Sequence, residues 1–396
     1  MDFRDTPEEA AFRKEVRDWL DANLDRAQMQ TQLSVGPPEE RIDNLRAWQA
    51  KLHEGGWAGV SWPKEYGGRG ASLLEQAIFY QEMARSKAPA PINVIGLGMA
   101  GPTIIVHGRE DQKQRYLSKI LSAEEIWCQG FSEPGAGSDL GALRSTAVQD
   151  GDHYVINGQK VWTTLAHVAK WCIFLARTDP DAPKHKGITY FLVDMQSPGV
   201  EVRPLRQMTG TAEFNEMFFT DVRVPRENIQ GDQNDGWRVA MTTLMNERGT
   251  LGFALSVQAR IAFDDLINKA KTLKRNGKPA IEDPVIRQRI GQLHVEIEAL
   301  RLTGYRALST VIKTGIPGPE GSLGKLLWSE SMKRLTDLAI ELYGPAGLTT
   351  EWKGDEDLKR WAFAALRSRG NTIEAGTSEI LRNIIAERVL GLPRHR

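Results

Sequence analysis

The sequence is poor in cysteine and has no excess of charge, and both absences narrow what the chain can be. Its 396 residues include two cysteines, Cys128 and Cys172, which are too few for a disulfide framework, so buried free thiols are expected. Lys plus Arg and Asp plus Glu each number 51, which gives no bulk attraction to nucleic acid or to an anionic membrane. Any charged ligand must therefore be met by local groups.

Long hydrophobic runs are also absent from the sequence. No stretch approaches the roughly 18 apolar residues of a membrane span, and the acidic segment 1–9 lacks the apolar centre of a secretory signal. The seven histidines show no metal-ligand spacing, so no metal site is predicted. We expect a cytoplasmic protein with no membrane span and no nucleic-acid partner.

What the sequence does contain is a change of hydrophobic period along the chain. Residues 6–123 have helical spacing and begin with a capping box of Thr6, Pro7 and Glu9. The period then becomes two, in runs rich in aromatic and β-branched residues. These runs are 154–162, 171–176, 187–193, 200–202 and 215–224. Beyond residue 236 helical spacing returns, first over 237–274.

This order predicts an α+β fold in three parts. We expect an N-terminal helical domain over 1–123, a middle β-barrel or sandwich domain over 124–232, and a C-terminal helical bundle over 233–396. Within the middle part, Asn157-Gly158 predicts a hairpin turn, because a type I′ turn needs positive φ at both central residues.

Two segments of the middle part have the composition of a ligand wall. Glu133-Pro134-Gly135-Ala136-Gly137-Ser138-Asp139 places two glycines where backbone approaches something closely or turns with positive φ. Downstream, Trp162 offers an apolar face for a planar ring, and Thr164 offers a hydroxyl at its edge. Together the two segments predict one wall of a flat, polar-edged cofactor pocket.

A third segment lies near the C-terminus, at 371–388. Thr377 is expected to be the N-cap of a helix that carries Glu379 in its first turn and packs Ile380, Ile384 and Ile385 on the core. A helix start has free N–H groups and suits an anion or a developing negative charge. A structural turn and a ligand contact are therefore both compatible with this segment.

Together the three segments resemble the acyl-CoA dehydrogenase family over nearly the whole chain, including the helical, β, helical order. The resemblance implies FAD between the β-domain and the C-terminal helices, an acyl-CoA thioester against the flavin, and an electron-transfer flavoprotein as acceptor. It also implies a homotetramer, with a mixed tetramer of two different chains as the alternative. The acyl group that the resemblance implies comes from fatty acid or sterol catabolism, and its length and branching stay open.

The resemblance also assigns roles to residues. Phe131 and Ser132 match the loop beside the flavin, Ser138 matches a contact to both flavin and CoA, and Trp162 and Thr164 match the residues that flank the isoalloxazine. In the C-terminal part, Gly344, Thr377 and Glu379 match FAD contacts, and the Ala375 N–H matches a group that polarises the thioester oxygen.

The catalytic base is the point at which the sequence departs from much of the family. The usual Glu before Gly-Thr is Ala375 here, whereas a second family location reads Glu247-Arg248. Helical steps through 240, 244, 247, 251 and 254 put Glu247 in an apolar stripe, where a carboxylate is either paired or functional. Glu247 is the expected base, Arg248 an expected CoA contact, and Glu374 the competing base.

Two further departures affect the cofactor contacts. Leu273-Lys274-Arg275-Asn276-Gly277 stands where an Arg-x-x-Phe-Gly segment is usual, and Glu341 stands where the family has Gln. The expected function is FAD-dependent α,β-dehydrogenation of an acyl-CoA to the trans-2-enoyl-CoA. The alternatives are a flavin oxidase or oxygenase of the same fold, and an FAD-binding partner subunit of a mixed tetramer.

Overall fold

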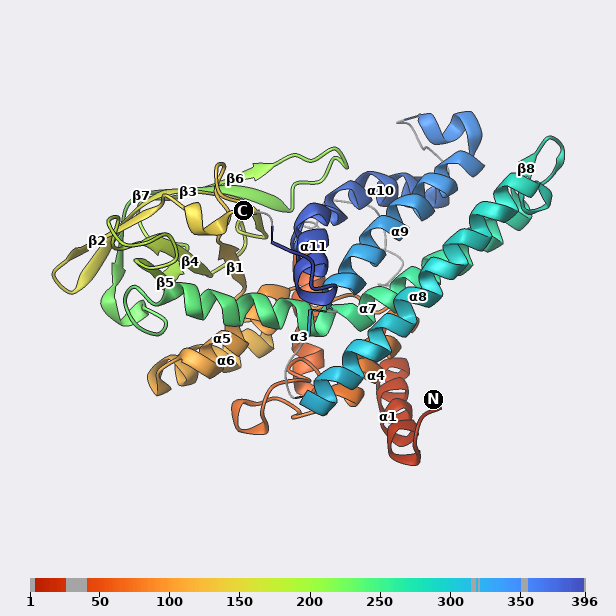
Figure 1. Cartoon of the computed structure of the whole chain (residues 1–396). Coiled ribbons are helices and arrows are strands. Elements are labelled where there is room, and N and C mark those ends of the chain that lie inside the picture. The colour runs from red at the N-terminus through yellow and green to blue at the C-terminus, as the bar shows by residue number, and fades with distance from the viewer. Residues whose placement is uncertain (1–3, 26–40, 315–317, 320, 350–354, 395–396) are drawn as a thin grey trace. The chain divides into compact units, whose positions relative to one another are not determined.

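The computed structural model describes residues 4–25, 41–314, 318–319, 321–349 and 355–394, without the side chains of 246–254. Figure 1 traces a helical, then β, then helical order along the chain. The chain divides into two compact units, each described here by itself. The sheet unit comprises 36–71 and 89–247, and the bundle unit comprises 1–35, 72–88 and 248–396.

The sheet unit contains one seven-stranded sheet, in the order β1-β4-β2-β3-β7-β6 with β5 paired to β4. β1 runs parallel to β4, and the β2–β3, β3–β7, β4–β5 and β6–β7 pairs are antiparallel. The strands are β1 Trp127–Gly130, β2 Thr146–Asp150, β3 His153–Thr164, β4 Trp171–Arg177, β5 Ile188–Asp194, β6 Val200–Leu205 and β7 Phe214–Pro225. All five predicted strand runs are present.

β4 shows how the sheet separates two parts of the core. Trp171, Ile173 and Leu175 belong to one buried cluster, while the alternate residues Cys172 and Phe174 belong to another. Both faces are covered, so six consecutive residues of β4 are buried. The Cys172 Cα is in register with that of Cys128 on β1, and both thiols are free and buried, as predicted.

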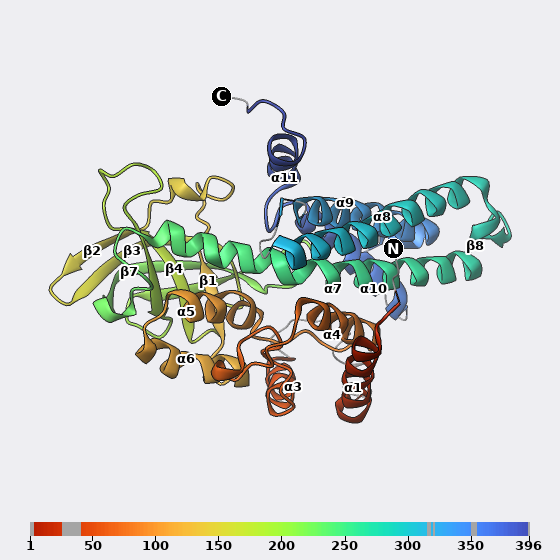
Figure 2. The same ribbon diagram turned by 60° about the horizontal axis from the view of Figure 1, so that its bottom comes forward.

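Helices of the sheet unit cover one of these faces (Figure 2). Ile104, Ile120 and Val239 pack from three helices onto Ile173 and Leu192 of the sheet. The helices of this unit are α3 Ile42–Glu54, α5 Gly101–His107, α6 Glu110–Ser122 and the first turns of α7 Gly236–Thr272. The short segments are η2 Lys64–Tyr66, η3 Gly96–Ala100, η4 Leu140–Ala142 and η5 Arg226–Asn228.

The hairpin prediction at Asn157-Gly158 is wrong. Both residues lie inside the 12-residue strand β3, and the two-residue turn lies earlier, at Gly151-Asp152 between Asp150 and its partner His153. Gly158 serves close packing instead, because a Cβ there would come within 2.2 Å of the Ser145 Oγ. The glycine was correctly noticed, but it permits two strands to approach and does not turn the chain.

The bundle unit packs long helices around its own core. Phe263, Leu293, Leu338 and Trp361 represent the buried cluster, with one residue from each of four helices. Its helices are α1 Pro7–Asn23, α4 Leu73–Arg85, the later turns of α7, α8 Pro284–Thr314, α9 Gly321–Leu342, α10 Glu356–Asn371 and α11 Ser378–Ile384. The smaller elements are β8 Lys274–Arg275, β9 Lys278–Pro279, η6 Ala280–Glu282, η7 Gly344–Leu348 and η8 Ile385–Val389.

The start of α1 follows the sequence pattern. The Thr6 Oγ1 accepts from the Glu9 N–H at 3.2 Å, and the Glu9 carboxylate accepts from the Thr6 N–H at 2.8 Å. α7 also begins and ends within two residues of its predicted bounds. The predicted capping box and fold class are thus confirmed, although residues before 124 are divided between the two units.

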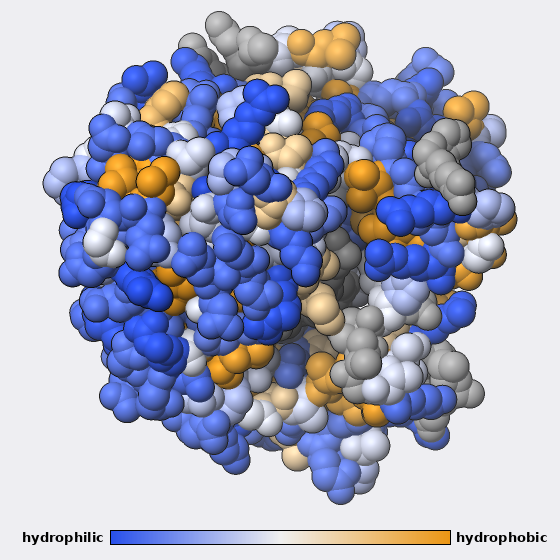
Figure 3. Space-filling model, turned by 60° about the vertical axis from the view of Figure 1, so that its left-hand side comes forward, coloured by the Kyte–Doolittle hydropathy of each residue, from blue (hydrophilic) through white to orange (hydrophobic). Residues whose placement is uncertain are grey.

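Charged and polar residues prevail on the face of the molecule that Figure 3 shows, and hydrophobic ones are scattered among them. Scattered apolar residues of this kind are ordinary for a folded surface. In the described part of the chain, each helix is too short or too polar to cross a bilayer.

Candidate functional site

The glycine-rich loop after β1 is anchored at one side and open at the other. Phe131 is buried at its base, and the Ser132 carbonyl accepts from the Val161 N–H of β3 at 3.0 Å. Gly135 and Gly137 are exposed at its tip, where an added Cβ would meet no atom within 4 Å. Neither glycine has positive φ, so that part of the sequence interpretation is wrong, and the tip remains open to a ligand.

A buried ion pair fastens this loop to the sheet. Lys160 of β3 is completely buried, and its Nζ lies 2.9 Å from the Glu133 Oε1. Nζ also donates to the carbonyl oxygens of Phe131 at 3.2 Å and Leu175 at 2.8 Å. These three acceptors match the three N–H groups of an ammonium.

The Glu133 carboxylate is satisfied equally well. It accepts from the Ser145 N–H at 2.9 Å and from the Arg144 N–H at 2.6 Å. Burial alone would raise the pKa of Glu133, but the Lys160 charge and these N–H groups outweigh burial and hold that pKa below its usual value. The two charged side chains therefore form a buried network in which each has its hydrogen-bond partners, and this network joins the loop to the strands.

A β-bulge next to this pair exposes Trp162. Lys160 pairs with Met217 and Thr163 with Asn215, so β3 carries one more residue than β7 across this interval. Trp162 takes φ +62°, a left-handed conformation that bulges allow, and is 61% exposed. Its ring meets that of Phe214 edge-on, with centroids 6.2 Å apart. The bulge thus presents a large aromatic face beside the anchored loop.

The remaining predicted residues of this wall lie around the same features. Thr164 ends β3 opposite Phe214 and is half-buried. Ser138 is exposed on the loop, next to Asp139, whose carboxylate pairs with Lys184 at 2.6 Å. The structure therefore places Phe131 and Ser132 beside Lys160 and Val161, and Trp162 and Thr164 further along the same strand. Ser138 lies on the connected loop.

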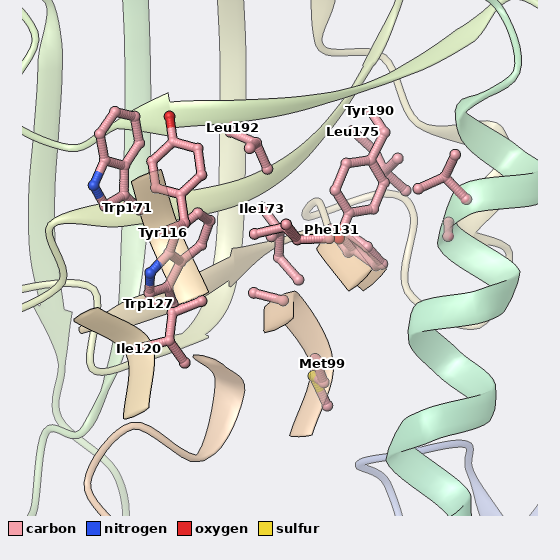
Figure 4. Close-up of a cluster of buried hydrophobic side chains, with 14 of the residues drawn as sticks. Met99, Tyr116, Ile120, Trp127, Phe131, Trp171, Ile173, Leu175, Tyr190 and Leu192 are labelled. Atoms are coloured by element: carbon pink, nitrogen blue, oxygen red, sulfur yellow. The ribbon is translucent and has the colours of Figure 1, made fainter. Parts of the chain in front are cut away.

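Hydrogen bonds link the buried end of this wall to α7. Phe131 packs edge-on against Tyr190, with ring centroids 5.8 Å apart (Figure 4). The Tyr190 hydroxyl lies 3.2 Å from the Thr243 Oγ1, which lies 2.9 Å from the Thr103 Oγ1 of α5. Thr243 is one helical turn before position 247. This network fixes the start of α7 against the sheet.

The predicted base and its neighbour are not described at side-chain level. Positions 247 and 248 lie within the bounds of α7, and the Glu247 and Arg248 side chains lie outside the described residues. Upstream on the predicted stripe, Ala240 is buried and Leu244 packs against the sheet-unit core. The two described residues of the stripe are therefore buried, at Ala240, and partly buried, at Leu244.

The C-terminal segment has the predicted cap. The Thr377 Oγ1 accepts from the Ile380 N–H at 3.2 Å, and α11 begins at Ser378 with Glu379 in its first turn. The Glu379 carboxylate accepts from its own backbone N–H and from the Thr377 hydroxyl at this helix start, which lowers its pKa. Ala375 has φ +51° and the Gly376 carbonyl accepts from Lys325 at 2.8 Å, so a strained, anchored turn precedes the cap.

Two carboxylates of the bundle unit are held by arginines. Glu374, the competing base, pairs with Arg367 at 2.7 Å. Glu341 lies 3.2 Å from Arg275 and also pairs with Arg289. Glu341, a departure from the family pattern, is therefore paired with Arg275, which lies within the departing segment 273–277. Gly344, nearby at the start of η7, has φ +59° and open space around a would-be Cβ.

Sequence reasoning did not assign roles to Lys160, Glu133, Tyr190 and Thr243. A signal for Lys160 was present, because Tyr154, Ile156 and Lys160 occupy alternate, inward positions of the same strand. A lysine at an inward position requires a buried partner. Tyr190 and Thr243 lie in apolar surroundings, and only the folded chain shows that their hydroxyls meet.

The residues of the sheet unit fit a flat cofactor. An exposed indole held out by a bulge offers an apolar face, and the open loop beside it offers backbone groups and hydroxyls. With its helical, β, helical order, the chain has the architecture of a flavin-dependent dehydrogenase of acyl thioesters.

The comparisons support this class. Residues 6–124, 128–222 and 234–390 match the N-terminal, middle and C-terminal domains of acyl-CoA dehydrogenase. The chain therefore belongs to the acyl-CoA dehydrogenase family, oxidoreductases that act on CH–CH bonds of acyl-CoA, and the family resemblance is confirmed.

Relatives of known identity cover almost the whole chain. It is 44% identical over 388 residues to acyl-CoA dehydrogenase IpdE1 of Mycobacterium tuberculosis, covering 97% of each chain. Among solved structures it is similar to "Tcur3481-Tcur3483 steroid ACAD", with a TM-score of 0.86, 30% identity and 100% of each chain covered. The ChsE4-ChsE5 complex of Mycobacterium tuberculosis gives the same three values.

Proposed function

We propose that this chain removes two hydrogens from adjacent carbons of an acyl-CoA thioester, with FAD as the acceptor, and forms the trans-2-enoyl-CoA. The observation that carries this proposal is the wall of the sheet unit, in which a buried ion pair fixes the loop at Ser132 beside the exposed Trp162. Bound FAD would take up the hydride that leaves the β carbon.

The chain's own residues divide the remaining tasks. Phe131, Ser132, Trp162 and Thr164 would form the flavin wall, and Ser138 would reach both flavin and CoA. Glu247 would remove the α proton, because a carboxylate in an apolar stripe is desolvated and becomes a stronger base. The Ala375 N–H would hold the thioester oxygen, a contact commonly worth roughly 3 to 4 kcal/mol per donor.

Further contacts complete the proposed site. Arg248 would meet CoA, and Gly344, Thr377 and Glu379 would contact the FAD diphosphate region. The engagement of Glu374 by Arg367 supports Glu247 over Glu374 as base. The domains are proposed to be 1–123, 124–232 and 233–396.

The substrate is proposed to be a steroid-derived acyl-CoA, with fatty acyl-CoA as the comparison. The similarity to a structure titled as a steroid ACAD supports this choice. We also propose a cytoplasmic tetramer that passes electrons to an electron-transfer flavoprotein. The ChsE4-ChsE5 complex supports assembly with a second, related chain, and a homotetramer is the alternative.

Anaerobic mixing with CoA esters tests this function. The FAD-loaded protein should lose its visible flavin absorbance with steroid-derived esters faster than with straight or branched ones. Glu247→Gln should keep FAD and bleach about a thousandfold more slowly, because a positioned base contributes roughly 10² to 10⁴. Glu374→Gln is the matched control and should bleach like the wild type. A fully active Glu247→Gln protein would refute the assignment.

A non-catalytic partner subunit is the second candidate function. The ion pairs that Glu341 makes with Arg275 and Arg289 favour this candidate. Arginines that are already paired within the chain have less positive charge to offer the FAD diphosphate. A protein that stays colourless, or is yellow and inert to every ester until a second chain is co-expressed, would support this candidate over the first. Bleaching only of substrates without CoA would instead indicate an oxidase or oxygenase.

A further inference from the structure

The Glu133–Lys160 pair has a geometry that stability alone does not explain. Both charges are withdrawn from water, with Lys160 at 0% and Glu133 at 8% exposure. Replacing such a buried pair by neutral side chains of similar size is often neutral for stability or even stabilising, because desolvation of the charges offsets their attraction. The pair is therefore better understood through what it holds in place.

What it holds is backbone from three segments of the sheet unit. Lys160 fixes the carbonyl groups of Phe131 in the loop and Leu175 in β4. Glu133 fixes the N–H groups of Arg144 and Ser145, just before β2. Methionine at position 160 has no N–H to donate, so it cannot hold the Phe131 and Leu175 carbonyl groups as the Lys160 ammonium does.

The held segments adjoin the proposed flavin wall on both sides. Phe131 and Ser132 directly precede Glu133 in the loop, and Trp162 follows Lys160 by two residues in β3. Between them, the Val161 N–H donates to the Ser132 carbonyl at 3.0 Å. The bulge begins directly after Lys160. The ion pair therefore sets the position of the loop relative to β3 and the point at which Trp162 departs from regular strand pairing.

We propose that Glu133 and Lys160 are positioning residues for FAD. They would hold the loop at Ser132 and the bulge at Trp162 in the relative position that the proposed flavin wall requires. The assignment rests on the proposed function, because it takes FAD as the ligand of this wall. Both side chains are buried, so the pair would act through the backbone that it fixes.

A neutral double variant separates positioning from stability. Glu133→Gln with Lys160→Met removes both charges and leaves no lone buried ion, so the protein should stay folded and its thermal midpoint should fall less than that of Lys160→Met alone. We expect the dissociation constant for FAD, measured by titrating the apoprotein, to rise at least about tenfold, which corresponds to 1.4 kcal/mol. The visible spectrum of the bound flavin should change as well.

The matched control removes an ion pair from the same sheet. Lys170 and Asp194 lie 2.7 Å apart, each about one-third exposed, and join the start of β4 to the end of β5. Lys170→Met with Asp194→Asn removes the same two charges, and FAD affinity and spectrum should match the wild type. An equal loss of FAD in both double variants would show a general charge effect and overturn the assignment.

Glu133→Asp covers the case in which the neutral variant does not fold. It keeps the charge but shortens the side chain by one methylene, so the protein should fold, bind FAD more weakly and show a shifted flavin spectrum. Wild-type FAD affinity and spectrum in either Glu133 variant overturn the positioning role alone. A wild-type protein that binds no FAD would instead overturn the proposed function, and this assignment with it.

Discussion

The two units each bury a carboxylate, but they surround it differently. Glu133 in the sheet unit meets one lysine, itself completely buried, and its other partners are backbone N–H groups. Glu82 in the bundle unit is 3% exposed and meets Arg13 and Arg17, whose side chains are 21% and 45% exposed. Burial alone would raise the pKa of Glu82, but both arginines outweigh it and lower that pKa.

The contrast separates two uses of a buried charge. The arginines come from α1 and the carboxylate from α4, so the Glu82 cluster joins two helices through side chains. Its cations can be hydrated if the carboxylate is lost. The Glu133 pair has no such access to water and acts on backbone. The same residue type therefore cross-links helices in one unit and, in the other, holds the backbone of the proposed flavin wall.

Loss of Lys160 should have the largest effect on stability. Lys160→Met leaves the Glu133 carboxylate buried without its cation, so we expect the free energy of unfolding to fall by about 3 to 5 kcal/mol. Urea denaturation followed by circular dichroism measures this change. A loss below about 1 kcal/mol would show that water reaches Glu133, and the contrast between the units would disappear.

Glu82→Gln should cost less, about 1 to 2 kcal/mol in the same urea experiment. The amide still accepts one hydrogen bond, and the exposed parts of Arg13 and Arg17 reach water, so no uncompensated charge remains. A cost as large as that of Lys160→Met would mean that Arg13 and Arg17 depend on Glu82 as strongly as Glu133 depends on Lys160.

Acid should remove the Glu82 contribution. Its folded-state pKa lies below the ordinary value of 4.5, so the stabilisation is fully present above that value and is lost as pH falls through the lowered pKa. The gap between wild type and Glu82→Gln should therefore close between about pH 5 and pH 3. Unfolding curves at stepped pH measure it, and a constant gap would contradict the lowered pKa.

Trp162→Phe should have the smallest effect on stability. The indole is 61% exposed, and exposed substitutions usually change the free energy of unfolding by no more than about 0.5 kcal/mol. FAD affinity should nevertheless fall, because the smaller ring covers less of the cofactor. A large stability loss with unchanged FAD affinity would assign Trp162 to packing and remove it from the wall.

The sequence predicted what depends on local periodicity. The strand runs, the α1 capping box and the α7 bounds follow from spacing and capping chemistry, and the structure has all of them. It misassigned Asn157-Gly158, because a glycine required by contact with Ser145 has the same local appearance as one required by a turn. Partners from distant segments, such as Tyr190 and Thr243, meet only through the tertiary fold.

The extra residue in β3 has a consequence for how this surface can vary. Before it, the buried residues Tyr154, Ile156 and Lys160 occupy even positions, whereas after it the buried residue is Thr163, at an odd position. Residue 162 thus lies outside the alternation by which every second residue of β3 points into the interior. Evolution can exchange the ring at this position to suit another ligand while the hydrogen-bonded registration of the surrounding strands is kept.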